Sequence, residues 1–553
     1  MVMTGNVIKK IFLVVVLSLG CFSAGIRLSA QGTTYNYFYR VYFKDKGDLN
    51  PNNFSPEDLL SQKAINRRQK AGIYAPVYSD LPVNPDYLTQ VISKGFNLHC
   101  TSKWMNTGLF KTQNQANINL ILNLPFVKDV KIVKKPAAKS SYSDKLDFSL
   151  EMADTPPFDR PLTMLNGQSL HNSGYDGTGI LIAVLDGGFL KADMISSLNE
   201  LRARGGIKGT RDFVSNGEYV YDYHNHGTAV LSVLAGKIPG IIEGTAPGAD
   251  FWLLRTEDTS TEFPVEEDFW AAGAEFADSI GADIISSSLG YYNFDDPVMN
   301  YKFSDMDGNT TFVTQAADFA ASKGILVINS AGNERTTAWQ RIIAPSDGDS
   351  VVAAGAVDGY NVISTFSSAG PSADGRIKPD NATQGVSVTV QTLETTVGRA
   401  NGTSFSCPVL SGICACVMQA VPKAVNTDII NALHKNGDRF NAPDSLYGYG
   451  IPDMVGVVTT LQELLITKSD NETVIGPNPF TGDIEITFKK TPGTLKIMIY
   501  TSSGQIIVNR IYKEYIGRTL KISDLQNNQK GVYIITLITS YGTYSHKVIK
   551  LNN

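Results

Sequence analysis

Four polar residues of this 553-residue chain have side chains of the kinds that nucleophilic catalysis needs: Asp186, Asn333, His226 and Ser404. A serine hydroxyl is a weak nucleophile until a base takes its proton, and that base works best when a carboxylate orients it. An amide N–H that points at the developing negative charge lowers the barrier further. Together these residue types predict a hydroxyl nucleophile served by a histidine base.

Each of these residues also has an ordinary structural explanation when it is taken alone. Asp186 follows the apolar run "ILIAVL" and could form a turn or cap a helix, whereas His224 and His226 could be a solvated pair or a chance metal site. Asn333 and the hydroxyls beside Gly402 are of types common in turns. The chemical interpretation therefore requires a fold that brings the four residues together.

The stretch "NGTSFSCPVLSG" (401–412) places Ser404 where a nucleophile is useful. Thr403 or Ser404 is expected to begin a helix that continues to Val417, and the first four N–H groups of a helix have no partner inside it. Ser404 would then offer both an attacking hydroxyl and a backbone N–H for an oxyanion. Pro408 is expected in or next to the first turn, where its missing N–H costs least.

The region from about 150 to 465 alternates short apolar runs with helical stretches. Runs such as "ILIAVL", "DFWLLR" and "GILVIN" are typical of strands buried on both faces of a parallel sheet. We therefore predict an α/β fold, a doubly wound and mostly parallel sheet. Ligands of such sheets bind beyond the carboxyl ends of the strands, which is where Asp186 and Asn333 stand.

The order Asp, His, Asn, Ser across one α/β region resembles that of the subtilisin-like serine proteases, the subtilases. The motifs that carry the resemblance are "AVLDGGF", "HGTAVLSVLAG", "NSAGNE" and "NGTSFSCPVLSG", within roughly residues 150–465. It implies a subtilisin-like fold and a serine endopeptidase that hydrolyses peptide bonds through an acyl-enzyme.

The resemblance also implies a role for each residue. Ser404 would attack the scissile carbonyl, His226 would accept and return the proton, and Asp186 would orient the imidazole. Asn333 and the Ser404 N–H would bind the oxyanion. His224 would be a neighbour of the base, because only His226 precedes the Gly-Thr pair of the motif.

The segment "DIISSSLG" (283–290) resembles the substrate-lining strand of the family, on which an extended peptide pairs through main-chain hydrogen bonds. The residues expected there are Ser286, Ser287, Ser288, Leu289 and Gly290. This favours polypeptide substrates over small esters.

No cofactor is expected to be required, and calcium is the one ion that the sequence leaves open. Asp305, Asp307 and Asn309 alternate in a glycine-containing loop, although Ala316 stands where an EF-hand has its glutamate. A plain solvated turn is the alternative. Phe405 follows the nucleophile where many relatives carry an oxidisable methionine, which predicts resistance to mild peroxide, and Cys407 is expected to be a packing residue.

Composition divides the chain into four parts: a signal peptide (1–30), a propeptide and linker (31–148), the catalytic domain (149–466) and a C-terminal β-sandwich (467–553). The second part reads as a small α+β domain followed by a cleavable linker. It resembles the propeptide of Bacteroidetes-type subtilases, which would act as an intramolecular inhibitor. The last part alternates apolar residues with period two and resembles the sorting domain read by the type IX secretion system.

The amino-terminal segment and the overall charge bear on location and partners. Lys9 and Lys10 precede an apolar run too short to span a bilayer, and "LSA" leads into Gln31, which predicts a secretory signal; a lipid-modified Cys21 is the alternative. The formal net charge of −5 and the lack of a basic block argue against a nucleic-acid partner. Five cysteines are too few for disulfides to be the main cross-links of an exported chain. We expect a secreted or cell-surface protein exported through the periplasm of a Gram-negative bacterium.

Two other functions stay open on the sequence alone. One is an inactive homologue that keeps the fold as a surface-binding protein or adhesin, and the other is an esterase or transpeptidase that uses the same residues. Serine-directed labelling separates the first from an enzyme, and cleavage of casein separates a protease from an esterase.

Overall fold

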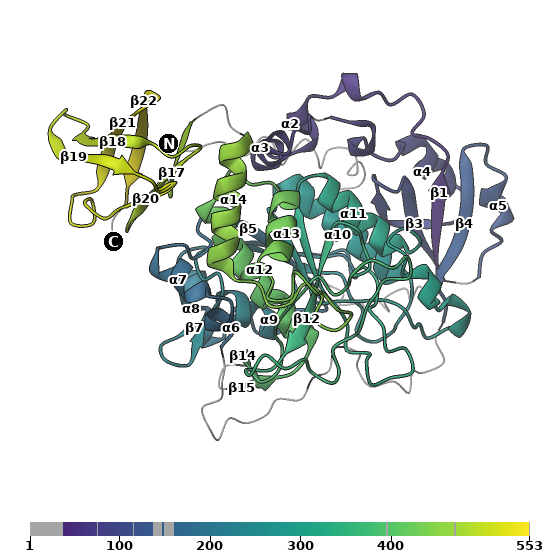
Figure 1. Cartoon of the computed structure of the whole chain (residues 1–553). Coiled ribbons are helices and arrows are strands. Elements are labelled where there is room, and N and C mark those ends of the chain that lie inside the picture. Colours follow the sequence, from purple (N-terminus) through teal and green to yellow (C-terminus); the bar gives the residue numbers. More distant parts are fainter. Residues whose placement is uncertain are drawn as a thin grey trace, which may run out of the picture.

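A computed structural model describes residues 37–74, 76–113, 115–136, 146, 148, 160–393, 396–468 and 472–551. The predicted signal peptide and most of the predicted linker lie outside these residues. Figure 1 shows a central α/β part in blue to green, with a purple N-terminal part beside helices α10 and α11 and a yellow C-terminal part beside α14.

A seven-stranded sheet forms the centre of the molecule, and every neighbouring pair in it is parallel. In order across the sheet the strands are β13 (Asn381–Gln384), β12 (Val351–Val357), β11 (Leu326–Ser330), β10 (Ile284–Ser287), β5 (Leu181–Asp186), β9 (Asp250–Arg255) and β6 (Ile207–Asp212). Strands β5, β10, β11 and β12 are buried along their whole length, as the continuous apolar runs predict. The predicted α/β class is confirmed.

Helices cover both faces of this sheet. Successive β5 residues face opposite ways: Ile182 and Val184 pack with α9 (His226–Ala235) and α12 (Thr403–Ala420). Ala183 and Leu185 pack on the other side with α10 (Val265–Ile280) and α11 (Phe312–Ser322). The remaining elements of this part are α6 (Pro161–Met164), α7 (Gly167–Asn172), α8 (Asn199–Ala203), β7 (Lys237–Ile238), β8 (Ile242–Glu243), β14 (Val388–Leu393), β15 (Thr396–Ala400), α13 (Asn426–Lys435) and α14 (Met454–Lys468).

Helix α12 is long and apolar enough to cross a membrane by length and composition alone. However, 89% of its apolar window is buried inside the protein. Its hydrophobicity therefore matches its place as the central helix of the core, where it contacts β10, β11, β12 and α9.

The N-terminal part is a small α+β unit, as predicted. Its antiparallel sheet has the order β2 (Asn97–Ser102), β3 (Thr107–Thr112), β1 (Tyr37–Phe43) and β4 (Val127–Lys134). The charged stretch from Pro56 to Lys70 forms two helices, α2 (Pro56–Leu59) and α3 (Gln62–Lys70). Ser61 separates them because its hydroxyl accepts a hydrogen bond from the backbone N–H of Ala64 and so caps the second helix. Two further helices are α4 (Pro85–Ile92) and α5 (Asn119–Leu122).

Buried ionic contacts join this unit to α10. Arg40 donates two hydrogen bonds to Asp268, from Nε to Oδ1 at 2.8 Å and from Nη2 to Oδ2 at 2.6 Å. Arg67 and Arg68 both pair with the Asp278 carboxylate. All of these side chains are at most 4% exposed, so separating them would leave uncompensated buried charges.

The carboxylate of Glu275, also on α10, binds a turn of the N-terminal unit. It accepts hydrogen bonds from Ser102 Oγ at 2.5 Å, Lys103 N at 2.9 Å and Trp104 N at 3.0 Å. Three donors on one buried carboxylate fix the position of this turn on the α/β part.

The C-terminal part consists of two antiparallel sheets around a core of their own. One sheet contains β16 (Thr473–Gly476), β17 (Ile484–Phe488) and β20 (Thr519–Ile522). The other has the order β19 (Ile506–Tyr515), β18 (Gly493–Thr501), β21 (Gly531–Thr539) and β22 (Gly542–Lys550). The predicted period-two residues, such as Ile484, Ile486 and Phe488, are fully buried between them. The predicted all-β class of this part is confirmed.

His99 gives the contact between the N-terminal unit and the α/β part a dependence on pH. Its Nε2 lies 2.8 Å from the Phe213 carbonyl oxygen, its ring packs 5.2 Å from that of Phe269, and Lys111 Nζ lies 3.3 Å from Nδ1. Burial, with a smaller effect of Lys111, lowers the pKa of His99 to about 4, although the Phe213 carbonyl and Asp212 act to raise it. The packed state therefore prefers the neutral ring.

We predict that His99 makes the full chain less stable at pH 5 than at pH 7. Since the ring has a pKa near 6.5 when it is exposed, its stabilising effect is complete above that pH and is lost as the pH falls toward 4, by about 2 kcal/mol at pH 5. Calorimetry at both pH values would show a larger drop in unfolding temperature for the parent than for His99→Gln, which keeps a donor but does not titrate. Equal drops would contradict the prediction.

Candidate active site

A buried carboxylate–imidazole pair forms where β5 ends and α9 begins. Asp186 is the last residue of β5, and His226 is the first residue of α9. His226 Nδ1 lies 2.9 Å from Asp186 Oδ1 and 3.0 Å from Oδ2, and the two side chains are 3% and 0% exposed. The carboxylate accepts from Nδ1–H, so the other ring nitrogen, Nε2, is the one able to accept a proton.

Backbone contacts hold the two residues of the pair in place. Gly187 N donates to Asp186 Oδ1 at 2.7 Å, and Gly227 N donates to the Gly188 carbonyl at 3.1 Å. His226 N donates to His224 Nδ1 at 3.1 Å, which makes His224 a support of the α9 start. His226 therefore pairs with the Asp186 carboxylate, whereas His224 binds the backbone at the start of α9.

Ser404 is the second residue of α12 and is half-buried. Its hydroxyl makes no hydrogen bond within the described part of the chain. The ring of the next residue, Phe405, has its centroid 6.0 Å from that of His226. Hydrogen bonds between a nucleophile and its base are often long or absent in a free enzyme and tighten when substrate binds.

Pro408 has a different place from the one predicted. Although the helix starts at Thr403, as expected, Pro408 is its sixth residue and so lies beyond the first turn. A residue there would normally donate its N–H to the Ser404 carbonyl, and proline has none. The Ser288 hydroxyl donates to that carbonyl instead, at 2.9 Å. The missing helical hydrogen bond thus leaves the Ser404 carbonyl free to bind Ser288, which lies directly after β10.

The Asn333 side chain is exposed and lies three residues beyond the end of β11. Its Oδ1 accepts from both N and Oγ1 of Thr403, each at 2.9 Å, so its Nδ2 donors face away from Thr403. The point where a Cβ on Gly402 would lie is 3.5 Å from Asn333 Nδ2 and 3.7 Å from Ser404 N. Two N–H donors therefore flank one position at the start of α12.

Thr403 is a residue of this site whose role the sequence analysis did not identify. Its position could have indicated a role, because Thr403 has a hydroxyl side chain and stands directly before the predicted nucleophile at a helix start. Its second contact, from Gly332 N to Oγ1 at 3.2 Å, ties the loop after β11 to α12.

Most side chains of the predicted substrate strand are buried. Ser286, Ser287 and Leu289 are at most 2% exposed. Ser287 Oγ accepts from Trp270 Nε1 at 3.0 Å. Since β10 ends at Ser287, the main chain from Ser288 to Gly290 lies beyond its strand pairing. Any recognition by this segment would therefore use its backbone, as the sequence analysis expects.

The calcium candidates take part in local turns. Asp305 Oδ2 accepts from Lys302 N at 2.8 Å, and Asp307 Oδ1 accepts from Asn309 N at 2.9 Å. The Asn309 carbonyl accepts from Gln315 Nε2 at 2.8 Å. Calcium binding by these residues stays a prediction.

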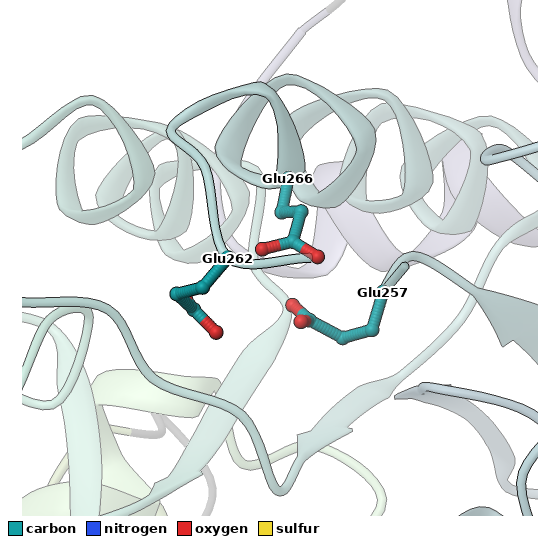
Figure 2. Close-up of side chains that lie close together, drawn as sticks. All are labelled: Glu257, Glu262 and Glu266. Carbon is teal, nitrogen blue, oxygen red and sulfur yellow. The ribbon is translucent and has the colours of Figure 1, made fainter. Parts of the chain in front are cut away.

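A different acidic group lies before and within the first turn of α10. The carboxylates of Glu257, Glu262 and Glu266 point toward one another, and one oxygen of each lies within 4.8 Å of the others (Figure 2). Glu266 Oε1 accepts from Asp258 N at 2.9 Å, and the Tyr291 hydroxyl donates to Glu257. Acidic side chains are favourable at a helix N-terminus, so Glu266 stabilises the start of α10.

Cys407 is fully buried one turn after Ser404. Its thiol lies 3.4 Å from the carbonyl oxygens of Ser287 and Ile328. Burial raises the pKa of Cys407 to about 11.

We predict that Cys407 resists alkylation in the native protein. With a pKa near 11, about one thiol in a thousand would be ionised at pH 8, and only the thiolate reacts. Mass spectrometry after brief treatment with iodoacetamide should find the Cys407 peptide unmodified in native protein and modified after unfolding in guanidinium. Rapid modification of the native protein would show that the site opens.

Comparison with protein families identifies three segments. A model described as the subtilase family matches residues 177–450, and one described as the peptidase S8 propeptide domain of Bacteroidota matches residues 38–147. A third, the secretion system C-terminal sorting domain, matches residues 474–551. The predictions of the family, the propeptide and the sorting domain are confirmed, and the sorting domain places the protein outside the cell or on its surface.

Several known proteins are similar to this chain. Subtilisin DY of Bacillus licheniformis is 28% identical over 301 residues, which cover 54% of this chain and 96% of the relative. Subtilisin E of Bacillus subtilis is 28% identical over 328 residues, covering 59% and 76%. Among solved structures, MycP1 from Mycobacterium smegmatis matches with a TM-score of 0.44 and 20% identity, over 56% of this chain and 88% of that one. The chain thus carries a domain of the subtilase family, between a Bacteroidota-type subtilase propeptide and a C-terminal sorting domain.

Proposed function

We propose that this protein is a secreted serine endopeptidase, made as a zymogen, that hydrolyses peptide bonds through an acyl-enzyme. The observation that carries the proposal is the buried Asp186–His226 pair, with Ser404 at the start of the neighbouring helix α12. The family match to residues 177–450 supports it.

In the proposed first step, Ser404 Oγ attacks the carbonyl carbon of the scissile bond while His226 Nε2 takes its proton. Asp186 keeps Nδ1 protonated and stabilises the imidazolium that forms. Asn333 Nδ2 and Ser404 N stabilise the oxyanion, and the loss of one such donor typically costs about a hundredfold to a thousandfold in kcat. The imidazolium then protonates the leaving amine, which departs.

In the second step, His226 activates water to hydrolyse the ester on Ser404. The nucleophile, the proton carrier and the oxyanion donors all come from the chain, so we propose that the chemistry needs no cofactor. The backbone of Ser288, Leu289 and Gly290 is proposed to pair with an extended polypeptide substrate. The propeptide is proposed to inhibit the enzyme until it is removed.

We predict that a fluorophosphonate probe labels the parent protein and does not label Ser404→Ala. The reason is that the probe reacts only with a hydroxyl activated by a base. Casein cleavage by the same preparations should disappear with the label. Labelling without cleavage of casein would favour an esterase, and equal labelling of both proteins would exclude Ser404 as the nucleophile.

Thr403→Val should lower kcat about tenfold with little change in KM, because the hydroxyl that helps to orient Asn333 acts on the transition state. Thr403→Ser keeps the hydroxyl and should restore most of the rate. Steady-state kinetics on one peptide substrate would check this. A rise in KM at unchanged kcat would indicate a role in substrate binding instead.

A further inference from the structure

One isoleucine side chain fills the space beside two glycines that follow strands β10 and β11. The isoleucine is Ile343, and the glycines are Gly290 and Gly332. We propose that Ile343 limits the size of the substrate side chain next to the scissile carbonyl, so that the protein cuts after small uncharged residues such as alanine. This inference rests on the proposed function and names the class of peptide bond that the site would accept.

The two glycines belong to segments that leave the central sheet next to each other. Strands β10 and β11 are parallel neighbours, with Ser287 opposite Asn329. Asn329 Nδ2 then donates to the Leu289 carbonyl at 2.9 Å, which joins the two segments beyond the strands. One segment, 288–290, is the proposed support of the substrate backbone, and the other leads to Asn333, the proposed oxyanion donor. A substrate bound to both would have its acyl-side side chain between them.

Ile343 occupies the space that the two glycines leave open. A Cβ on Gly290 would overlap Ile343 Cδ1, and a Cβ on Gly332 would lie 3.0 Å from the same atom. The other atoms closest to these two points are the Ala344 carbonyl oxygen and Ser368 Oγ, neither of which is charged. Glycine at both positions leaves room for a large side chain, and the isoleucine takes that room.

Hydrogen bonds hold the backbone of this isoleucine in place. The Ile343 carbonyl accepts from Ser346 N at 2.9 Å and from Ser346 Oγ at 2.6 Å. Tyr291, directly after the 288–290 segment, donates its N–H to the Ala344 carbonyl at 2.8 Å. The Ile343 side chain itself is buried, at 7% exposure. Because the surroundings are packed and the backbone is fixed, a large substrate residue would have to displace atoms at a cost in binding.

The expected selectivity follows from the size and charge of the substrate side chain. Alanine adds one methyl group to the substrate backbone, whereas a phenylalanine ring would have to displace Ile343 or stay outside the space. One methylene group more or less in an apolar site typically changes specificity about 10- to 200-fold. A charged side chain would lose its water without gaining a partner of opposite charge.

The test compares two peptide p-nitroanilides that differ only in the residue before the scissile bond, which is alanine in one and phenylalanine in the other. The enzyme is the full chain after expression, in the form that the fluorophosphonate probe labels. We expect kcat/KM for the alanine substrate to be at least tenfold higher than for the phenylalanine substrate. A smaller ratio or a reversed preference would overturn the inference.

Ile343→Ala should shift this preference toward the larger residue. The shorter side chain opens the space, so the ratio of the two kcat/KM values, alanine over phenylalanine, should fall at least tenfold. The matched control is Ile241→Ala, which shortens an exposed isoleucine of the same domain and should keep the ratio of the parent. An unchanged ratio in Ile343→Ala would contradict the role of Ile343.

The cleavage products of casein test the same inference on the parent protein alone, in case Ile343→Ala does not fold. Mass spectrometry of the fragments should find alanine, glycine or serine before most of the cleaved bonds. Fragments that end mainly in phenylalanine, tyrosine or leucine would overturn the inference.

Fluorophosphonate labelling of the same preparation separates this result from the proposed function. If the parent is labelled and cuts casein mainly after large residues, the inference fails and the function stands. If the parent is not labelled and cuts neither casein nor the two anilides, the proposed function fails and this inference fails with it.

Discussion

The hydrogen bonds between the Asp186 carboxylate and the His226 ring form only if a strand end and a helix start are placed together. A fully buried carboxylate is costly unless donors compensate it, and here the donors are Gly187 N and His226 Nδ1. The end of β5 must therefore meet the start of α9 to within hydrogen-bonding distance. Because β5 lies between β10 and β9 in the parallel sheet, that meeting point is fixed by the strands on both sides.

The start of α12 is held by contacts of a second kind, which come from loops at the same edge of the sheet. Thr403 binds the loop after β11 through Asn333 and Gly332. Ser288, directly after β10, binds the carbonyl that Pro408 leaves without a helical partner. The half-buried serine between these contacts has little freedom to move, which suits a group that must be in place before a substrate arrives.

The sequence was sufficient to predict the class of fold, and it singled out Asp186 and His226, which the structure brings together. Buried parallel strands produce continuous apolar runs, and polar residues after such runs collect at one edge. The roles of Thr403 and Ser288 were not predictable, because they depend on hydrogen bonds between segments far apart in the chain. Nor does any local pattern reveal why a proline is tolerated inside α12, because that tolerance depends on a donor from Ser288.

The ion pairs between the N-terminal unit and α10 could not be predicted from the sequence either. Arginines on a short charged helix are usually exposed to solvent, yet Arg67 and Arg68 are buried against Asp278. Their burial depends on the docking of two units that composition treats as separate.

The C-terminal sheets have a hydrophobic core that shares no residue with the cores on either face of the central sheet. Their contacts with the rest of the chain include strands β16 and β17 against α14 (Figure 1). The sorting domain and the subtilase domain are therefore separate packing units of the polypeptide. A domain with a core of its own can fold without help from its neighbour, so the sorting domain and the subtilase domain can each change in sequence without disturbing the packing of the other.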